Sequence, residues 1–104
     1  QGHDGETVPR RVQKLIVNTG IRVLPDTFCW YCERLREVTL PAGLVKIGNS
    51  AFGFCRSLLE IDICTTVESI GMQAFAYCEL LTKVDFELSS SSPHQLKTIG
   101  RNAF

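Results

Sequence analysis

The chain has 104 residues and a mass of 11.6 kDa, which is enough for one domain and too little for two. Eleven Lys and Arg balance eleven Asp and Glu, so net charge does not draw the protein to nucleic acid, and no nucleic-acid partner is expected. Hydrophobic residues make up 44% of the chain, enough for a packed core, but no apolar run is long enough to span a membrane.

The first segment, residues 1–13, contains Gly2, Gly5 and Pro9 together with several charged residues. A regular apolar pattern begins near Lys14 and continues to the last residue, Phe104. We therefore expect an N-terminal tail or weak cap over 1–13, followed by a repeat domain over 14–104.

The repeat is clearest in the cysteines, because Cys32, Cys55 and Cys78 are separated by 23 residues and again by 23. The same spacing aligns three apolar columns: Leu35, Leu58 and Leu81; Val38, Ile61 and Val84; Leu40, Ile63 and Phe86. A period of about 20–29 residues with Leu-x-x-apolar-x-apolar spacing is typical of leucine-rich repeats, whose turns must stack to bury their apolar faces.

Each repeat predicts a strand, a second short strand and a less regular segment. Polar and apolar residues alternate over 37–40, 60–63 and 83–86, which indicates half-buried strands that pair in parallel. Apolar residues at spacings of 1, 3 and 3 over 51–58 and 74–81 indicate one or two helical turns on the opposite side. The stretches 44–47 and 67–70 could add a short strand before a glycine turn.

These patterns predict a repeat solenoid: a parallel β-sheet of leucine-rich repeats of 23 residues, with short helical or irregular segments on the opposite side. Phe86 and Ile99 are 13 positions apart where Leu40 and Ile47 are 7 apart, so six residues are inserted in a Ser-rich loop over 87–95. The sequence stops inside a repeat. We therefore expect a piece of a longer protein, or an end that another subunit covers.

A repeated motif carries a resemblance to a known family. The residues from Ile47 to Leu58 and from Ile70 to Leu81 both read Ile-Gly-x-x-Ala-Phe-x-x-Cys-x-x-Leu. This motif resembles the BspA-like, or treponemal-type, leucine-rich repeat over nearly the whole of 14–104. The resemblance implies surface adhesins or protein-binding scaffolds of microbes and unicellular eukaryotes, without catalysis.

The outward-facing positions of the strands are the candidate binding site. Side chains alternate along a strand, so one side of the sheet collects residues that the core does not use. The predicted contact residues are Glu37, Thr39, Glu60, Asp62, Lys83 and Asp85. Four carboxylates on one small surface suggest a site for a protein with a basic surface. The alternative is a solvated sheet face, partly neutralised by Lys83 and Lys14.

Trp30 is a further candidate contact residue, because its column otherwise contains only the small residues Gly53 and Ala76, so its ring should protrude. Its neighbour Tyr31 recurs at the period as Phe54 and Tyr77, which favours structural packing for that column.

Three thiols in one column lie within reach of a disulfide, but three in a row leave one unpaired. We therefore expect Cys32, Cys55 and Cys78 to be buried and reduced. Cys29 should also be buried, and Cys64 should be the most accessible of the five.

No catalytic or cofactor site is expected. The only histidines are His3 and His94, and neither can be assigned to a cysteine as its base. No C-x2-C pair suggests zinc, and a cation on Glu60, Asp62 and Asp85 would lack the carbonyl ligands that calcium usually takes.

The sequence therefore favours a non-catalytic protein-interaction module that binds through the exposed face of the parallel sheet. The alternative is a structural segment of a larger assembly that contacts its neighbours through the solenoid ends, in particular the open C-terminal end, or a fragment of a cell-surface adhesin.

Overall fold

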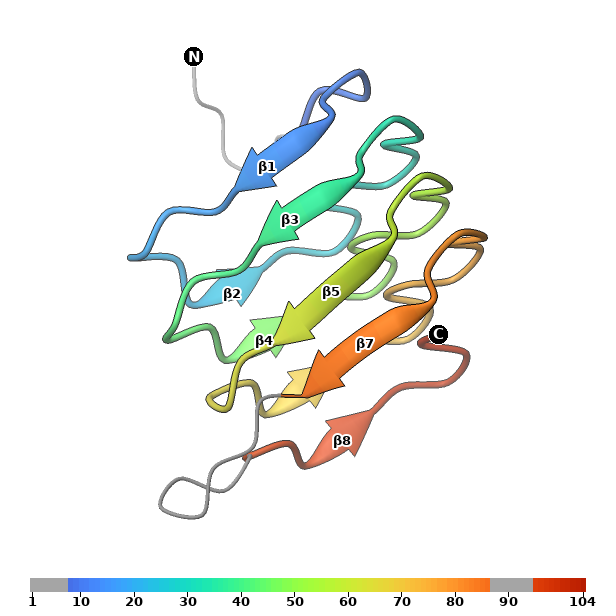
Figure 1. Ribbon diagram of the computed structural model, residues 1–104. Helices are drawn as coiled ribbons and strands as arrows, with labels where there is room; N and C mark the ends of the chain where they lie inside the picture. The colour runs from blue at the N-terminus through green and yellow to red at the C-terminus, as the bar shows by residue number, and fades with distance from the viewer. Residues whose placement is uncertain (1–7, 87–94) are drawn as a thin grey trace.

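Successive turns of the chain stack on one another, and each turn contributes one strand to each of two facing walls (Figure 1). The computed structural model describes residues 8–86 and 95–104. Within these ranges the strands are β1 (Lys14–Ile16), β2 (Val23–Leu24), β3 (Glu37–Thr39), β4 (Lys46–Ile47), β5 (Glu60–Ile63), β6 (Ser69–Ile70), β7 (Lys83–Phe86) and β8 (Thr98–Ile99). The predicted parallel solenoid is confirmed.

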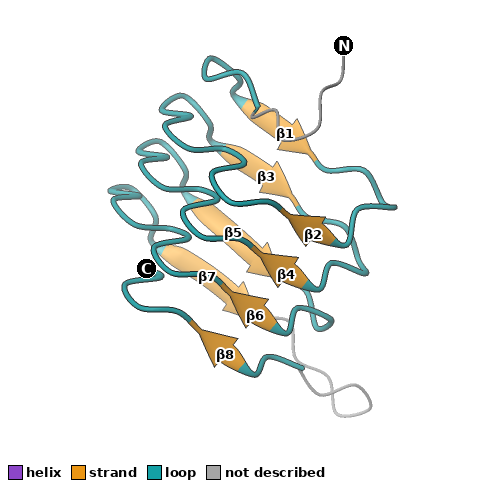
Figure 2. Cartoon of the chain, turned by 180° about the vertical axis from the view of Figure 1, so that it is seen from behind, coloured by secondary structure: helices purple, strands orange, loops and turns teal. Residues whose placement is uncertain are grey.

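Residues that are 23 positions apart in the sequence lie opposite each other in paired strands. β1 pairs with β3 in parallel, with Leu15 opposite Val38, and β5 pairs with β7, with Ile61 opposite Val84. In the second wall, β2, β4, β6 and β8 form one continuous parallel sheet (Figure 2). The predicted short strand before each glycine turn is therefore also confirmed.

The first wall differs in one respect from the predicted sheet. β3 and β5 lie side by side, but β1–β3 and β5–β7 are two separate hydrogen-bonded ladders. A hollow of about 220 Å³ lies between them, lined among others by Arg36, Thr39, Leu59 and Asp62. The outward face is thus a row of four strands with a seam at its centre.

The predicted insertion is visible in the register of the last strand. Ser69 of β6 pairs with Thr98 of β8, whereas the preceding pair, Lys46 and Ser69, keeps the 23-residue spacing. The difference equals the six inserted residues. Most of the predicted Ser-rich loop, residues 87–94, lies outside the described residues, and its last residue, Gln95, donates its backbone N–H to the Thr65 carbonyl at 2.9 Å.

The segments predicted as helical turns are irregular, and no helix occurs in the described part of the chain. Ser50 and Phe54 adopt left-handed backbone with φ of 57° and 60°, which an α-helix excludes. Along these segments, one backbone N–H donates within its own turn and the neighbouring N–H donates to the next turn. Gly53 donates to Ser50 within its own turn, at 3.1 Å, while Phe52 donates to Ala74 of the next turn, at 2.7 Å. The donors that a helix would use internally instead join neighbouring turns.

The core consists of repeated columns between the walls. Phe52 is fully buried and stacks on Phe75, with ring centroids 5.3 Å apart, and Phe75 stacks on Phe104 at 5.1 Å. Leucines and isoleucines of successive turns fill the remaining space. Because every column adds one apolar side chain per turn, burial depends on stacking rather than on any single turn.

The described part of the N-terminal segment packs on the first turn. Val8 donates its backbone N–H to the Phe28 carbonyl at 2.9 Å, and Val12 packs against the core cluster. Val12 also lies 23 residues before Leu35, so the repeat register extends back beyond Lys14. This relation was not recognised in the sequence, because a single Val gives little signal.

Candidate functional site

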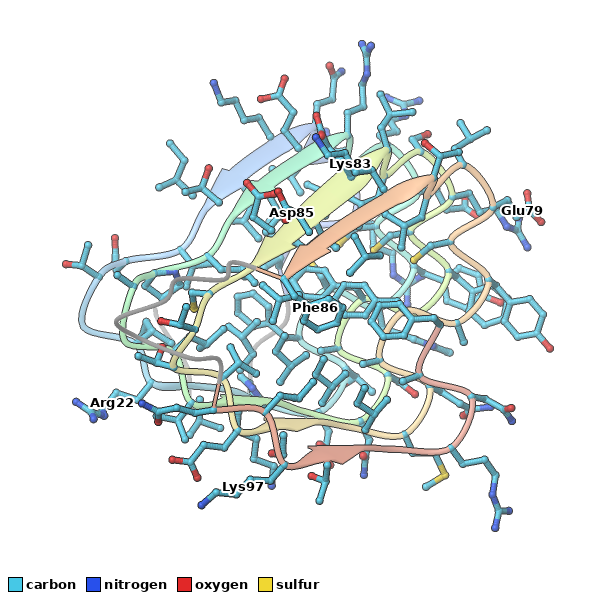
Figure 3. The ribbon with its side chains drawn as sticks, turned by 60° about the horizontal axis from the view of Figure 1, so that its bottom comes forward. Arg22, Glu79, Lys83, Asp85, Phe86 and Lys97 are labelled. Atoms are coloured by element: carbon cyan, nitrogen blue, oxygen red, sulfur yellow. The ribbon has the colours of Figure 1, made fainter. Side chains whose placement is uncertain are left out.

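The predicted contact residues of the strands lie on the outer face of the first wall. Glu60 and Asp62 of β5 are exposed, whereas Ile61 and Ile63 between and after them are buried. Figure 3 shows Lys83 and Asp85 projecting from the outer side of β7 while Phe86 points into the interior. Strand alternation therefore separates outward-facing residues from core residues as predicted.

The register decides which charges meet. Lys83 is directly opposite Glu60, and its Nζ lies 3.8 Å from Glu60 Oε1. Lys14 is opposite Glu37 with the same 3.8 Å separation between Nζ and Oε1. Two of the four predicted carboxylates are thus paired with lysines in exposed ion pairs, which are weak individually but cancel charge locally.

The remaining two carboxylates face each other. Asp62 is directly opposite Asp85 in the β5–β7 ladder, and no ion pair of either occurs among the described residues. Thr39 lies opposite Ile16, whose side chain is 66% exposed. The outer face therefore has an acidic pair, Asp62 and Asp85, in the β5–β7 ladder and a Lys–Glu ion pair at the start of each ladder. It also has an exposed apolar residue, Ile16, on β1.

Trp30 does not lie with these six residues. It belongs to the turn between β2 and β3 and lines a separate hollow of about 280 Å³, which Phe54 and Tyr77 of the next two turns also line. Its ring is 38% exposed, and the Arg10 guanidinium lies 5.9 Å from the ring centroid. The predicted contact residues thus form two surfaces.

The cysteine predictions are confirmed in part. All five cysteines are free thiols, and Cys29, Cys32 and Cys55 are fully buried. Cys55 Sγ donates to the Cys29 carbonyl at 3.2 Å, and Cys78 Sγ donates to the Phe52 carbonyl at 3.1 Å. The thiol column therefore repeats one hydrogen bond from turn to turn.

Two expectations about individual thiols are wrong. Cys78 is only half-buried, because its side chain lines an open hollow of about 340 Å³. Cys64 is buried rather than the most accessible, since its Sγ donates to the Pro41 carbonyl at 3.3 Å beneath the end of β5. The most accessible thiol is therefore that of Cys78.

A charged column on the turn side was missed in the sequence. Arg56 Nη1 lies 3.1 Å from Glu33 Oε2, and Arg56 Nε lies 3.9 Å from Glu79 Oε2. These residues are one period apart, and Arg10 occupies the same column one period earlier. The sign of the charge therefore alternates along the column. The 23-residue alignment shows this pattern when its charged positions are compared as well as its apolar ones.

The described residues contain no group of three or more His, Cys, Asp or Glu side chains placed to hold a metal ion. They also contain no helix with the length and apolarity needed to cross a membrane.

Stacked turns, a parallel register and repeated Ile-Gly and Phe columns define a leucine-rich-repeat solenoid. The chain belongs to the family described as the BspA type leucine rich repeat region, whose model matches residues 22–104. It is also similar to a leucine-rich repeat protein from Bacteroides ovatus of known crystal structure, with 34% identity and a TM-score of 0.78. That match covers 89% of this chain and 22% of the other, so the chain spans about a fifth of that protein's length. No curated protein was matched.

Proposed function

We propose that this chain is a non-catalytic protein-interaction module that binds a partner through the outer face of β1, β3, β5 and β7. The family and the fold support a protein-interaction or structural repeat module in general terms. The observation that carries the more specific proposal is the direct pairing of Asp62 with Asp85. Like charges in register destabilise a sheet, so this pair costs stability that a neutral pair would not.

The chemistry of the face fits a partner that brings a cation. A Lys or Arg side chain placed over Asp62 and Asp85 would neutralise both carboxylates at once, and a guanidinium could bind them with directed hydrogen bonds. Lys83 does not fulfil this role, because its nearest carboxylate is that of Glu60. Exposed Ile16 and Thr39 give the same face an apolar margin for partner side chains.

The test is a titration of the whole chain with an arginine-rich peptide at low salt, followed by isothermal calorimetry. Asp62→Asn with Asp85→Asn should weaken binding by about tenfold, since two charge-assisted contacts are lost. Glu33→Gln is the matched control, because Glu33 lies in the turn-side column with Arg56. Equal loss in both variants would indicate only general charge attraction, and unchanged binding would contradict the proposal.

A structural role is the second candidate, and one observation favours it. Apolar residues line the hollow of about 340 Å³ beside the last turn, and Leu81, Phe86 and Phe104 among them are partly exposed. A neighbouring subunit that covers this surface would bury a continuous apolar area. Sedimentation of the 104-residue chain over a range of concentrations tests this, with self-association expected. A monomer at high concentration would contradict it.

A further inference from the structure

A groove on the turn side of the solenoid is separate from the outer sheet face. It crosses three successive turns, has a volume of about 280 Å³ and is called here the aromatic groove. Its lining residues are Thr27, Trp30, Ser50, Gly53, Phe54, Gln73, Ala76 and Tyr77. None of them carries a charge, which distinguishes this groove from the acidic face around Asp62 and Asp85.

The aromatic rings in and beside the groove are locked by one another. Phe54 stacks between Tyr31 and Tyr77, with centroids 4.4 Å and 4.7 Å away and nearly parallel planes. Trp30 stands at 88° to Tyr31 and at 85° to Phe54. Because the faces of Phe54 are covered within the stack, this ring offers its edge to the groove. A preformed arrangement of this kind loses little side-chain entropy on binding.

Small residues keep the floor of the groove low. A Cβ atom on Gly53 would lie 3.1 Å from Cδ1 of Trp30, so the indole rests directly on the Gly53 backbone. One period later the column continues with Ala76. The Trp30 ring therefore projects above the small residues Gly53 and Ala76. Tyr77, which is 61% exposed, projects from the turn two periods later.

The other wall consists of one polar residue per turn: Thr27, Ser50 and Gln73. All three have positive φ, and their backbone N–H groups donate to the carbonyls of the next turn, at 2.9 Å in each case. The side chains of Ser50 and Gln73 make no hydrogen bond within the described part of the chain. The Thr27 hydroxyl donates to the Asp26 carbonyl at 2.6 Å, so the groups of this wall that are free for a ligand are the Ser50 hydroxyl and the Gln73 amide.

We propose that the aromatic groove binds a proline-rich peptide in the polyproline II conformation. Such a helix has three residues per turn and rises about 3.1 Å per residue, so prolines spaced three apart recur about every 9.3 Å. Parallel strands stack about 4.8 Å apart, so two turns of the solenoid span about 9.6 Å. Prolines at this spacing would meet Trp30 and Tyr77 in turn.

The hydrogen-bonding groups fit the same ligand. A polyproline II peptide has no internal hydrogen bonds, and its carbonyls need donors from outside. Trp30 Nε1–H, the Gln73 amide and the Tyr77 hydroxyl can supply them. Proline-rich segments are bound in this way by aromatic-lined grooves, in which the rigid peptide loses little entropy. A sugar that stacks on an aromatic face is favoured less, because the stack covers both faces of Phe54 and one face of Tyr77.

The experiment uses the single tryptophan of the chain as its reporter, because Trp30 itself lines the groove. A ten-residue peptide with proline at every third position is titrated into the whole chain and the fluorescence of Trp30 is followed. A peptide of the same composition with irregular proline spacing and a β-linked glucose oligosaccharide are titrated in parallel. We expect a saturable change with the regular peptide and at least a fivefold weaker response with the other two ligands.

Two variants keep the proposal testable if one of them folds poorly. Tyr77→Ala removes the second of the two projecting rings, Trp30 being the first. Gln73→Asn shortens the side chain of the polar wall while keeping a residue type that tolerates positive φ. Each should weaken peptide binding at least threefold, whereas Asp62→Asn on the outer face should leave it unchanged. No response to the regular peptide at millimolar concentration, equal binding of the irregular peptide, or preferential binding of the oligosaccharide would overturn the proposal.

Discussion

A Cβ atom added to Gly71 would lie 2.6 Å from the backbone nitrogen of Asn49, one turn away. The same contact recurs between Gly48 and Asp26. The backbones approach closely here because Asp26 Oδ1 accepts the N–H of Asn49 at 2.8 Å, and Asn49 Oδ1 accepts the N–H of Met72 at 2.8 Å. The Ile-Gly motif therefore requires glycine, because any side chain at this position would collide with the backbone of the preceding turn.

Gly71→Ala should destabilise the fold by about 1–3 kcal/mol or more, because backbone atoms cannot move aside as a flexible side chain can. Urea unfolding measures the change. Gly43→Ala is the control, since no atom lies within 4 Å of a Cβ at that position, and its stability should change by less than about 1 kcal/mol. Equal effects of the two substitutions would refute the steric explanation.

The sequence predicted the columns well, because stacking forces equivalent residues of successive turns into the same environment. The pairing of Leu15 with Val38 and the outward direction of Asp62 follow directly from period and alternation. The turn conformation could not be predicted in the same way. Phe54 and Tyr77 have positive φ although neither is glycine, and their apolar spacing also suits a helix.

The outward direction of the candidate residues and a partial neutralisation by Lys83 and Lys14 were predicted from the sequence, but not which carboxylates each lysine would pair with. Alternation identifies Glu60 and Lys83 as outward residues, and the register pairs them. Only side-chain geometry shows that Lys83 lies beside Glu60 and that no cation of the described residues pairs with Asp62 or Asp85. Periodicity also does not reveal the seam between β3 and β5, because the residue spacing is the same there as elsewhere.

Asp62→Asn should raise the free energy of unfolding by about 0.2–1 kcal/mol, because it removes the repulsion across the β5–β7 ladder. Chemical denaturation at low salt measures this, and the gain should shrink at 1 M NaCl. Glu60→Gln on the same strand should not stabilise, since it breaks the ion pair with Lys83. A gain in both variants would indicate that total negative charge, rather than the Asp62–Asp85 pair, is responsible.

Thiol accessibility should follow burial along the cysteine column. In the native protein, Cys78 should react first with a thiol reagent such as DTNB, because it is half-buried beside the terminal hollow. Cys55 is fully buried and should react only after unfolding. Cys78→Ala should remove the fast phase and leave the slow one. Fast native labelling of Cys55, or a disulfide between the two residues, would contradict the structure.

Stability should fall at alkaline pH. Contact with the Cys78 thiol and burial raise the pKa of Cys55, and contact with the Cys32 thiol and burial raise the pKa of Cys29. Unfolded cysteines ionise near about pH 8.5, where the folded state still holds these protons. The same contacts lower the pKa of Cys78 and Cys32, which adds stability as pH rises to about 8.5 and no slope above it. The contribution of Cys55 and Cys29 is fully present below about pH 8.5 and is lost above it, by up to about 1.4 kcal/mol per pH unit for each of these two thiols.

Urea unfolding at about pH 8.5 and about pH 10 measures this dependence. Cys55→Ala should reduce the slope of stability against pH, because alanine has no side-chain proton to lose in either state. Ser57→Ala is the control, because a serine hydroxyl does not ionise in this range, and it should retain the slope of the unchanged protein. A stability that is constant over this pH range would show that these thiols ionise as readily in the folded chain as in the unfolded one.

Arg56→Glu should destabilise the solenoid through the turn-side column, because it places a third carboxylate between those of Glu33 and Glu79. Each exposed ion pair contributes only about 0.2–1 kcal/mol, but the substitution both removes two attractions and adds two repulsions. It also removes the guanidinium that lies 5.5 Å from the Phe54 ring centroid. We expect a loss of about 1–2 kcal/mol at low salt and a clearly smaller loss at 1 M NaCl, measured by thermal unfolding.

Arg101→Glu changes the net charge equally at an exposed residue that makes no ion pair within the described chain, and it should have little effect. If both variants lose the same stability with the same salt dependence, the alternating column does not bind successive turns together and net charge alone explains the change.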